Sequence, residues 1–113
     1  MIYAAIALFA VAATLGLVNL LSWMKQKDAP RITVYTHGLF AATGLVLLIV
    51  YALQHAESFP KVAIGLFGAA ALGGFYLFYT DVTKKPHPVA IAFVHALLAV
   101  SGFVMLLLFA FGS

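Results

Sequence analysis

A short stretch containing a histidine occurs twice in the chain, 58 residues apart. The first copy runs from His37 to Gly44 and the second from His95 to Gly102. In both copies Leu, Ala, a hydroxyl residue and Gly follow the histidine at the same spacings. Both copies lie in strongly apolar runs, where histidine is rare and is usually kept for ligation, proton relay or a helix–helix hydrogen bond. These two histidines are therefore the first candidates for chemistry.

Composition identifies the chain as a membrane protein. Of its 113 residues, 65% are hydrophobic and only 8% are charged, too few to cover the surface of a soluble domain. Cysteine is absent, which excludes disulfides, thiolate-bound metals, iron–sulfur clusters and covalently attached c-type haem. The net charge of +3 comes from a few residues between the apolar runs, so nucleic acid is excluded as a partner.

Four apolar runs cover residues 2–23, 32–53, 62–79 and 89–111. Each has about the number of residues that a helix needs to cross the hydrocarbon of a bilayer, ~30 Å. Short connections make consecutive helices antiparallel. The sequence therefore predicts an all-α integral membrane protein, with residues 1–113 forming one up-down bundle of four transmembrane helices.

Basic residues predict the orientation of this bundle. Five of the six lysines and arginines follow the first and third runs: Lys25, Lys27, Arg31, Lys84 and Lys85. Because basic loops stay in the cytoplasm, we expect both termini outside. The predicted location is a bacterial inner membrane, with the termini in the periplasm.

The histidine stretches belong to a longer internal repeat. When residues 1–55 are aligned without gaps on residues 59–113, sixteen pairs are identical, among them His37 with His95 and Gly44 with Gly102. Each unit holds two helices, so both units insert with the same orientation and are related by an axis along the membrane normal. Residues 58 apart are then at the same depth on opposite sides of this axis.

This placement predicts one haem between the second and fourth helices. Two imidazoles on diagonal helices can bind one iron from both sides, and they do not complete the four-ligand set of zinc. Small residues continue the histidine face at Ala41, Gly44, Ala99 and Gly102, and we expect them to leave room for a flat macrocycle. The haem would lie in the cytoplasmic leaflet, with Arg31 and Lys85 among the partners of its propionates.

The arrangement resembles the small four-helix, membrane-embedded b-type cytochromes, in which histidine pairs on different helices hold haem. The resemblance rests on the architecture, His37 and His95. It implies one haem b per chain and electron transfer with quinone or another redox protein such as a cytochrome. Because bis-histidine iron has no open position, the sequence favours an electron-transfer protein over a stand-alone enzyme.

Other interpretations stay open. Four helices in a chain of this length also resemble the small multidrug-resistance exporters, although the first helix lacks their membrane-embedded glutamate. An accessory subunit of a larger membrane complex is a third alternative. His55 and His87 lie at the ends of helices, where a solvated interfacial role is the simplest prediction. A second haem shared through His55 across a homodimer stays open as well.

Overall fold

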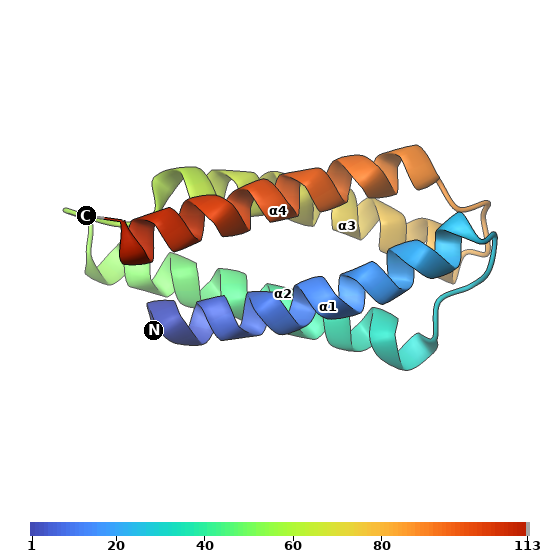
Figure 1. Ribbon diagram of the computed structural model, residues 1–113, viewed down its shortest axis with the longest axis horizontal. Helices are drawn as coiled ribbons and strands as arrows, with labels where there is room; N and C mark the ends of the chain where they lie inside the picture. The colour runs from blue at the N-terminus through green and yellow to red at the C-terminus, as the bar shows by residue number, and fades with distance from the viewer. Residues whose placement is uncertain (113) are drawn as a thin grey trace.

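Four long helices connected by short loops make up the protein in the computed structural model, which describes residues 1–112 (Figure 1). The helices are α1 (Ile2–Met24), α2 (Arg31–Gln54), α3 (Lys61–Val82) and α4 (Val89–Phe111). Each is long and apolar enough to span a membrane, and the prediction of four such helices is confirmed. Ser113, the last residue of the predicted second repeat, lies outside the described residues.

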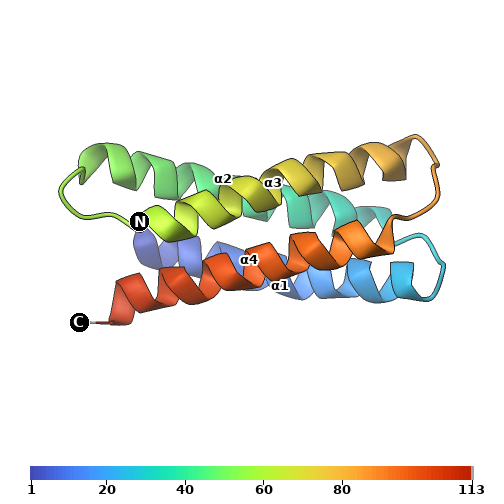
Figure 2. The same cartoon turned by 90° about the horizontal axis from the view of Figure 1, so that it is seen from above.

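The helices run up and down as two hairpins placed side by side. Both termini and the α2–α3 connection lie at one end, and the α1–α2 and α3–α4 connections lie at the other (Figures 1 and 2). Each helix packs against two neighbours, most extensively within its own hairpin, and α2 and α4 occupy diagonal corners. Most of the basic residues are in the two hairpin connections, so we call their end of the bundle the basic end.

Prolines and tight turns set the ends of the helices. Pro30, Pro60 and Pro88 immediately precede α2, α3 and α4, where a residue with no N–H costs the helix no hydrogen bond. After α1 the chain turns through Gln26, with φ of 61°, and after α3 through Lys84, with φ of 59°. The amide N–H three residues past the helix end then bonds back into the last turn, from Lys27 to Ser22 and from Lys85 to Thr80, which satisfies a terminal carbonyl.

Helix α3 extends three residues beyond its predicted end at residue 79. Its last turn includes Asp81, which ends the apolar run in the sequence. The carboxylate of Asp81 is nevertheless buried and pairs with Arg31 at the start of α2. An ion pair between residues 50 positions apart thus allows the helix to continue through a charged residue.

The interior contains two separate clusters of buried side chains. Near the termini, Phe9 of α1 and Phe67 of α3 stack with ring centres 3.9 Å apart, and Leu48 and Leu106 are fully buried beside them. At the basic end, Trp23 packs with Ala29, Leu77 and Ala92. Along α1, the segment from Ala12 to Gly16 lies between these clusters, and this is the level at which the histidines enter.

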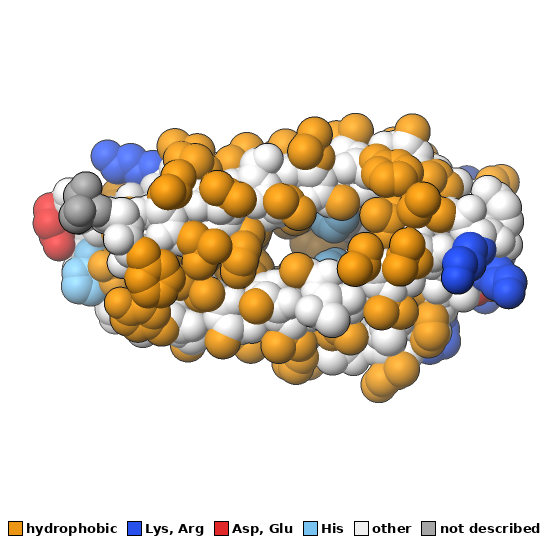
Figure 3. Space-filling model, in the orientation of Figure 1, with side chains coloured by type: hydrophobic (Ala, Val, Ile, Leu, Met, Phe, Trp, Pro, Cys, Tyr) orange, Lys and Arg blue, Asp and Glu red, His pale blue; other side chains and the backbone are white. Residues whose placement is uncertain are grey.

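The outer surface of the helical body is apolar. Orange apolar side chains cover its length, whereas charged side chains gather at the two ends (Figure 3). Apolar residues that face outward on different helices include Ile32, Leu53, Leu72 and Phe75. Such a surface suits hydrocarbon and not water.

Candidate functional site: a histidine pair inside the bundle

His37 of α2 and His95 of α4 come together from the diagonal corners of the bundle. The centres of their imidazole rings lie 6.1 Å apart, and the ring planes are 79° apart. Both side chains are partly buried. The sequence predicted that these two residues face each other, and the structure brings them together.

Each imidazole is held by a backbone carbonyl of the partner helix in its own hairpin. Nδ1 of His37 lies 2.7 Å from the carbonyl oxygen of Ala12, and Nδ1 of His95 lies 2.7 Å from that of Ala70. A carbonyl oxygen only accepts, so Nδ1 carries the proton and donates it. In the neutral ring, Nε2 then keeps its lone pair, which is the arrangement found in most metal-binding histidines.

The two Nε2 atoms remain free to take a ligand. Neither makes a hydrogen bond within residues 1–112. Over the same residues, the only fully buried side-chain nitrogen or oxygen atoms without a partner are Trp23 Nε1 and His87 Nδ1, so neither Nε2 is sealed in the interior. Figure 3 shows histidine side chains at the margin of an opening between the two hairpins.

The distance between the ring centres is that expected for one metal between them if both Nε2 atoms point to it. A ring nitrogen lies about 1.1 Å from the centre of imidazole and about 2.0–2.1 Å from a bound metal. Two imidazoles on opposite sides of one metal therefore have ring centres about 6.3 Å apart, and the observed distance is 6.1 Å. The pair belongs to no group of three or more His, Cys, Asp or Glu side chains in the described part of the chain. A tetrahedral zinc site would need further protein ligands of these types. A metal in a macrocycle would not need them, because the macrocycle provides ligands of its own.

Glycines of α1 and α3 make room for the imidazoles. A Cβ atom added at Gly16 would lie 2.9 Å from Cε1 of His37, and one added at Gly74 would lie 3.1 Å from Cε1 of His95. Gly16 and Gly74 are not among the site residues predicted from the sequence. Both are glycine and lie 58 residues apart, and this match within the repeat is the signal that could have identified them.

Gly44 and Gly102 make room for the rings of two phenylalanines. A Cβ atom at Gly44 would lie 3.0 Å from the ring of Phe9, and one at Gly102 would lie 3.2 Å from the ring of Phe67. The two glycines thus lie against the stacked phenylalanine pair, and their place beside a macrocycle stays a prediction. Ala41 and Ala99, one turn beyond the histidines, are half-buried.

The two basic residues expected to hold propionates have partners within the protein. The guanidinium of Arg31 forms an ion pair with the buried carboxylate of Asp81. The ammonium of Lys85 lies over the ring of Tyr79, 5.4 Å from its centre. Arg31 therefore has a structural role that the sequence analysis did not identify.

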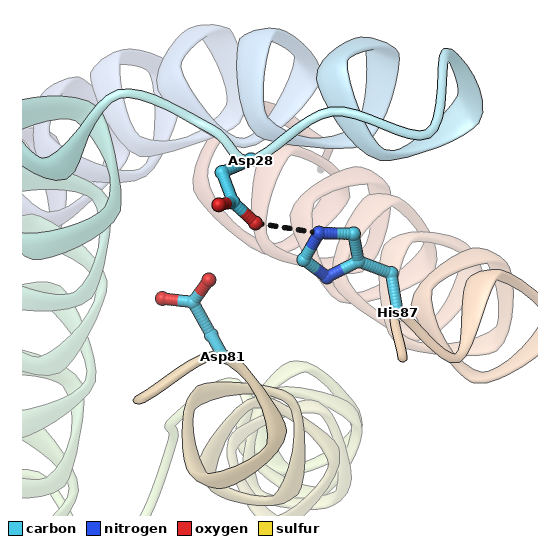
Figure 4. A group of neighbouring side chains, drawn as sticks. All are labelled: Asp28, Asp81 and His87. Carbon is cyan, nitrogen blue, oxygen red and sulfur yellow. Dashed lines mark hydrogen bonds and ion pairs between the residues drawn. The ribbon is translucent and has the colours of Figure 1, made fainter. Parts of the chain in front are cut away.

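A second polar cluster joins the hairpins at the basic end (Figure 4). Nε2 of His87 lies 2.9 Å from Oδ1 of Asp28, and the carboxylate of Asp81 points toward both. One ligand-capable atom from each of these residues lies within 4.8 Å of the other two. The geometry could hold a metal ion, but Arg31 already neutralises Asp81, so we interpret the cluster as a clasp between the hairpins. We call Arg31, Asp81, Asp28 and His87 the clasp.

His55 lies at the other end of the bundle. Its ring stacks on Tyr51 with centres 4.3 Å apart, and Nδ1 lies 3.6 Å from Oε1 of Glu57. The structure does not bring His55 to the histidine pair. A role in a homodimer stays a prediction.

Comparison with known proteins adds no relative: no protein-family model, curated protein or solved structure matches this chain.

Proposed function

We propose that the protein is a membrane-embedded b-type cytochrome that holds one haem between His37 and His95 and transfers electrons. The observation that carries the proposal is the paired imidazole geometry. Each ring has its Nδ1 proton directed to a backbone carbonyl and its Nε2 without a protein partner, and the ring centres are 6.1 Å apart. Bis-histidine ligation gives a low-spin iron suited to electron transfer.

The protein's own groups would prepare this site. The carbonyls of Ala12 and Ala70 fix the tautomer and direction of each imidazole, so the rings lose little conformational freedom when they bind iron. Haem supplies the reversible one-electron chemistry of the centre. The stacked rings of Phe9 and Phe67 close the interior on the side of the termini, which directs an elongated ligand toward the basic end. The redox partner is a quinone or another redox protein.

The membrane arrangement belongs to the same proposal. Four helices of sufficient length and apolarity, an apolar outer surface and basic hairpin connections support insertion with both termini outside. The two hairpins are a tandem parallel repeat, supported by contacts that recur at a spacing of 58 residues. These are the histidine–carbonyl bonds, the glycine–phenylalanine contacts and the turns at Gln26 and Lys84.

The test is the absorption spectrum of the purified full-length protein. We expect reduced-minus-oxidised bands of a low-spin b-type haem, and a pyridine haemochrome assay that gives one haem per chain. Protein from haem-replete cells that carries substoichiometric haem, and takes up none on titration, would contradict the proposal. Proton-coupled uptake by proteoliposomes of that haem-free protein would favour a transporter.

Replacing Gly74 by Ala should weaken haem binding about tenfold, the size of effect seen when groups that orient metal ligands are altered. The added methyl would lie 3.1 Å from Cε1 of His95 and would push the ring away from its present position. Gly68→Ala is the matched control, since it adds the same methyl to α3 with nothing within 4 Å. Haem titration of both variants measures the difference, and equal affinities would contradict the role of Gly74.

A further inference from the structure

Trp23 carries a buried N–H group that has no partner. The side chain is only 6% exposed, and its Nε1 is one of two fully buried side-chain nitrogen or oxygen atoms without a hydrogen bond in residues 1–112. Its neighbours in the basic-end cluster are the apolar side chains of Ala29, Leu77 and Ala92. Buried indole N–H groups normally find an acceptor, because leaving one unsatisfied costs about 1–3 kcal/mol. A missing acceptor at this position points to a ligand.

The second unpartnered nitrogen lies on the adjacent ring. Trp23 stacks on His87 with ring centres 4.4 Å apart and planes 14° apart. Nε2 of His87 faces Asp28 at 2.9 Å, while its Nδ1 is buried and has no partner. Two unsatisfied nitrogens thus belong to one stacked pair. Arg31 is in the same clasp, where it is paired with the carboxylate of Asp81.

This aromatic pair lies on the side of the histidine site that faces the basic end. Trp23 follows Gly16 by seven residues, which places the two on the same face of α1 and about 10 Å apart along it. Gly16 is against His37, and Trp23 is buried in the basic-end cluster. In the other direction the stacked Phe9 and Phe67 fill the interior. The polar edge of a ligand held by the histidines would therefore point toward Trp23.

From these observations we infer that Trp23 Nε1–H donates a hydrogen bond to a propionate carboxylate of the haem. The inference rests on the proposed function and deepens it. A carboxylate oxygen accepts this hydrogen bond and, being ionised, makes it stronger than a neutral acceptor would. Trp23 is a positioning residue that fixes which edge of the porphyrin faces the basic end.

The test compares haem with its dimethyl ester, which keeps the iron and porphyrin but has no carboxylate. Both are titrated into full-length protein purified from haem-deficient cells, as wild type and as Trp23→Phe, which retains an aromatic ring without the N–H. We expect Trp23→Phe to weaken haem binding about tenfold, about the size of a hydrogen bond to a charged group, and to weaken ester binding clearly less, because the ester offers only a neutral carbonyl acceptor. Tyr76→Phe, which removes an exposed polar group from another ring, is the control.

A second measurement needs no substitution. Trp23 is the only tryptophan of the chain, so ultraviolet resonance Raman reports on its N–H alone. The band sensitive to indole hydrogen bonding should shift more when haem is added than when the ester is added, because the neutral ester carbonyl is the weaker acceptor. The inference would be overturned if Trp23→Phe lost the same affinity for haem and for the ester, or if the indole band were the same with haem and with the ester. Neither result would contradict a haem held by the two histidines. Failure of the wild type to bind either porphyrin would overturn both proposals.

Discussion

Replacing either His37 or His95 by Ala should remove the haem. Under the proposed function, each substitution would take away one of the two histidines that hold the haem iron and leave a single imidazole. We expect the haem content of each purified variant to fall below about a tenth of the wild-type value, because losing a ligand costs more than the ten- to hundredfold seen on altering its supporting groups. The pyridine haemochrome assay gives the content, and the absorption spectrum shows whether any residual haem is low-spin.

The two variants should behave alike. Both histidines donate from Nδ1 to a carbonyl oxygen 25 residues earlier in the chain, at the same distance of 2.7 Å. His55→Ala is the control, because it removes an imidazole that pairs with Glu57 far from the site, and it should keep a full complement of haem. Circular dichroism checks that all three variants remain helical. Stoichiometric low-spin haem in either His37→Ala or His95→Ala would contradict axial ligation by this pair.

The helices and the meeting of the histidines could be predicted because both depend on local or periodic features of the chain. Apolar runs of membrane-spanning length set the four helices, and the spacing of 58 residues places His37 and His95 on diagonal elements. Loop length alone makes neighbours antiparallel. None of these inferences requires knowledge of which side chain touches which.

What the sequence did not reveal are the partners of inward-facing residues. Periodicity places Gly44 on the inner face but does not distinguish a phenylalanine ring from a porphyrin as its neighbour, and the structure has Phe9 there. It likewise does not show that Asp81 is neutralised by Arg31, since the pairing depends on how two hairpins are placed side by side. Trp23 has the pattern of an interfacial anchor, yet it lies buried against His87.

Replacing Arg31 by Met should be among the most destabilising substitutions in the bundle. The Asp81 carboxylate is only 3% exposed, and its hydrogen-bond partner in residues 1–112 is the guanidinium of Arg31. Removing that partner leaves a buried charge uncompensated, which in fully buried pairs costs 3–5 kcal/mol. Arg31 itself is 42% exposed, so water moderates the loss, and we expect the free energy of unfolding to fall by about 3 kcal/mol.

The double substitution Arg31→Met/Asp81→Leu separates this cost from the intrinsic value of the ion pair. Replacing both charges by apolar groups leaves no unpaired carboxylate, and buried pairs replaced in this way often lose little stability. We therefore expect the double variant to recover most of the stability that Arg31→Met loses.

Lys85→Met is the matched control: it removes one positive charge from the same end, where the ammonium of Lys85 lies over the ring of the exposed Tyr79, and should change stability by no more than about 0.5 kcal/mol. Unfolding by sodium dodecyl sulfate in mixed micelles, followed by circular dichroism, measures all three. A double variant as unstable as Arg31→Met would show that the clasp contributes through its attraction and not through relief of a buried charge.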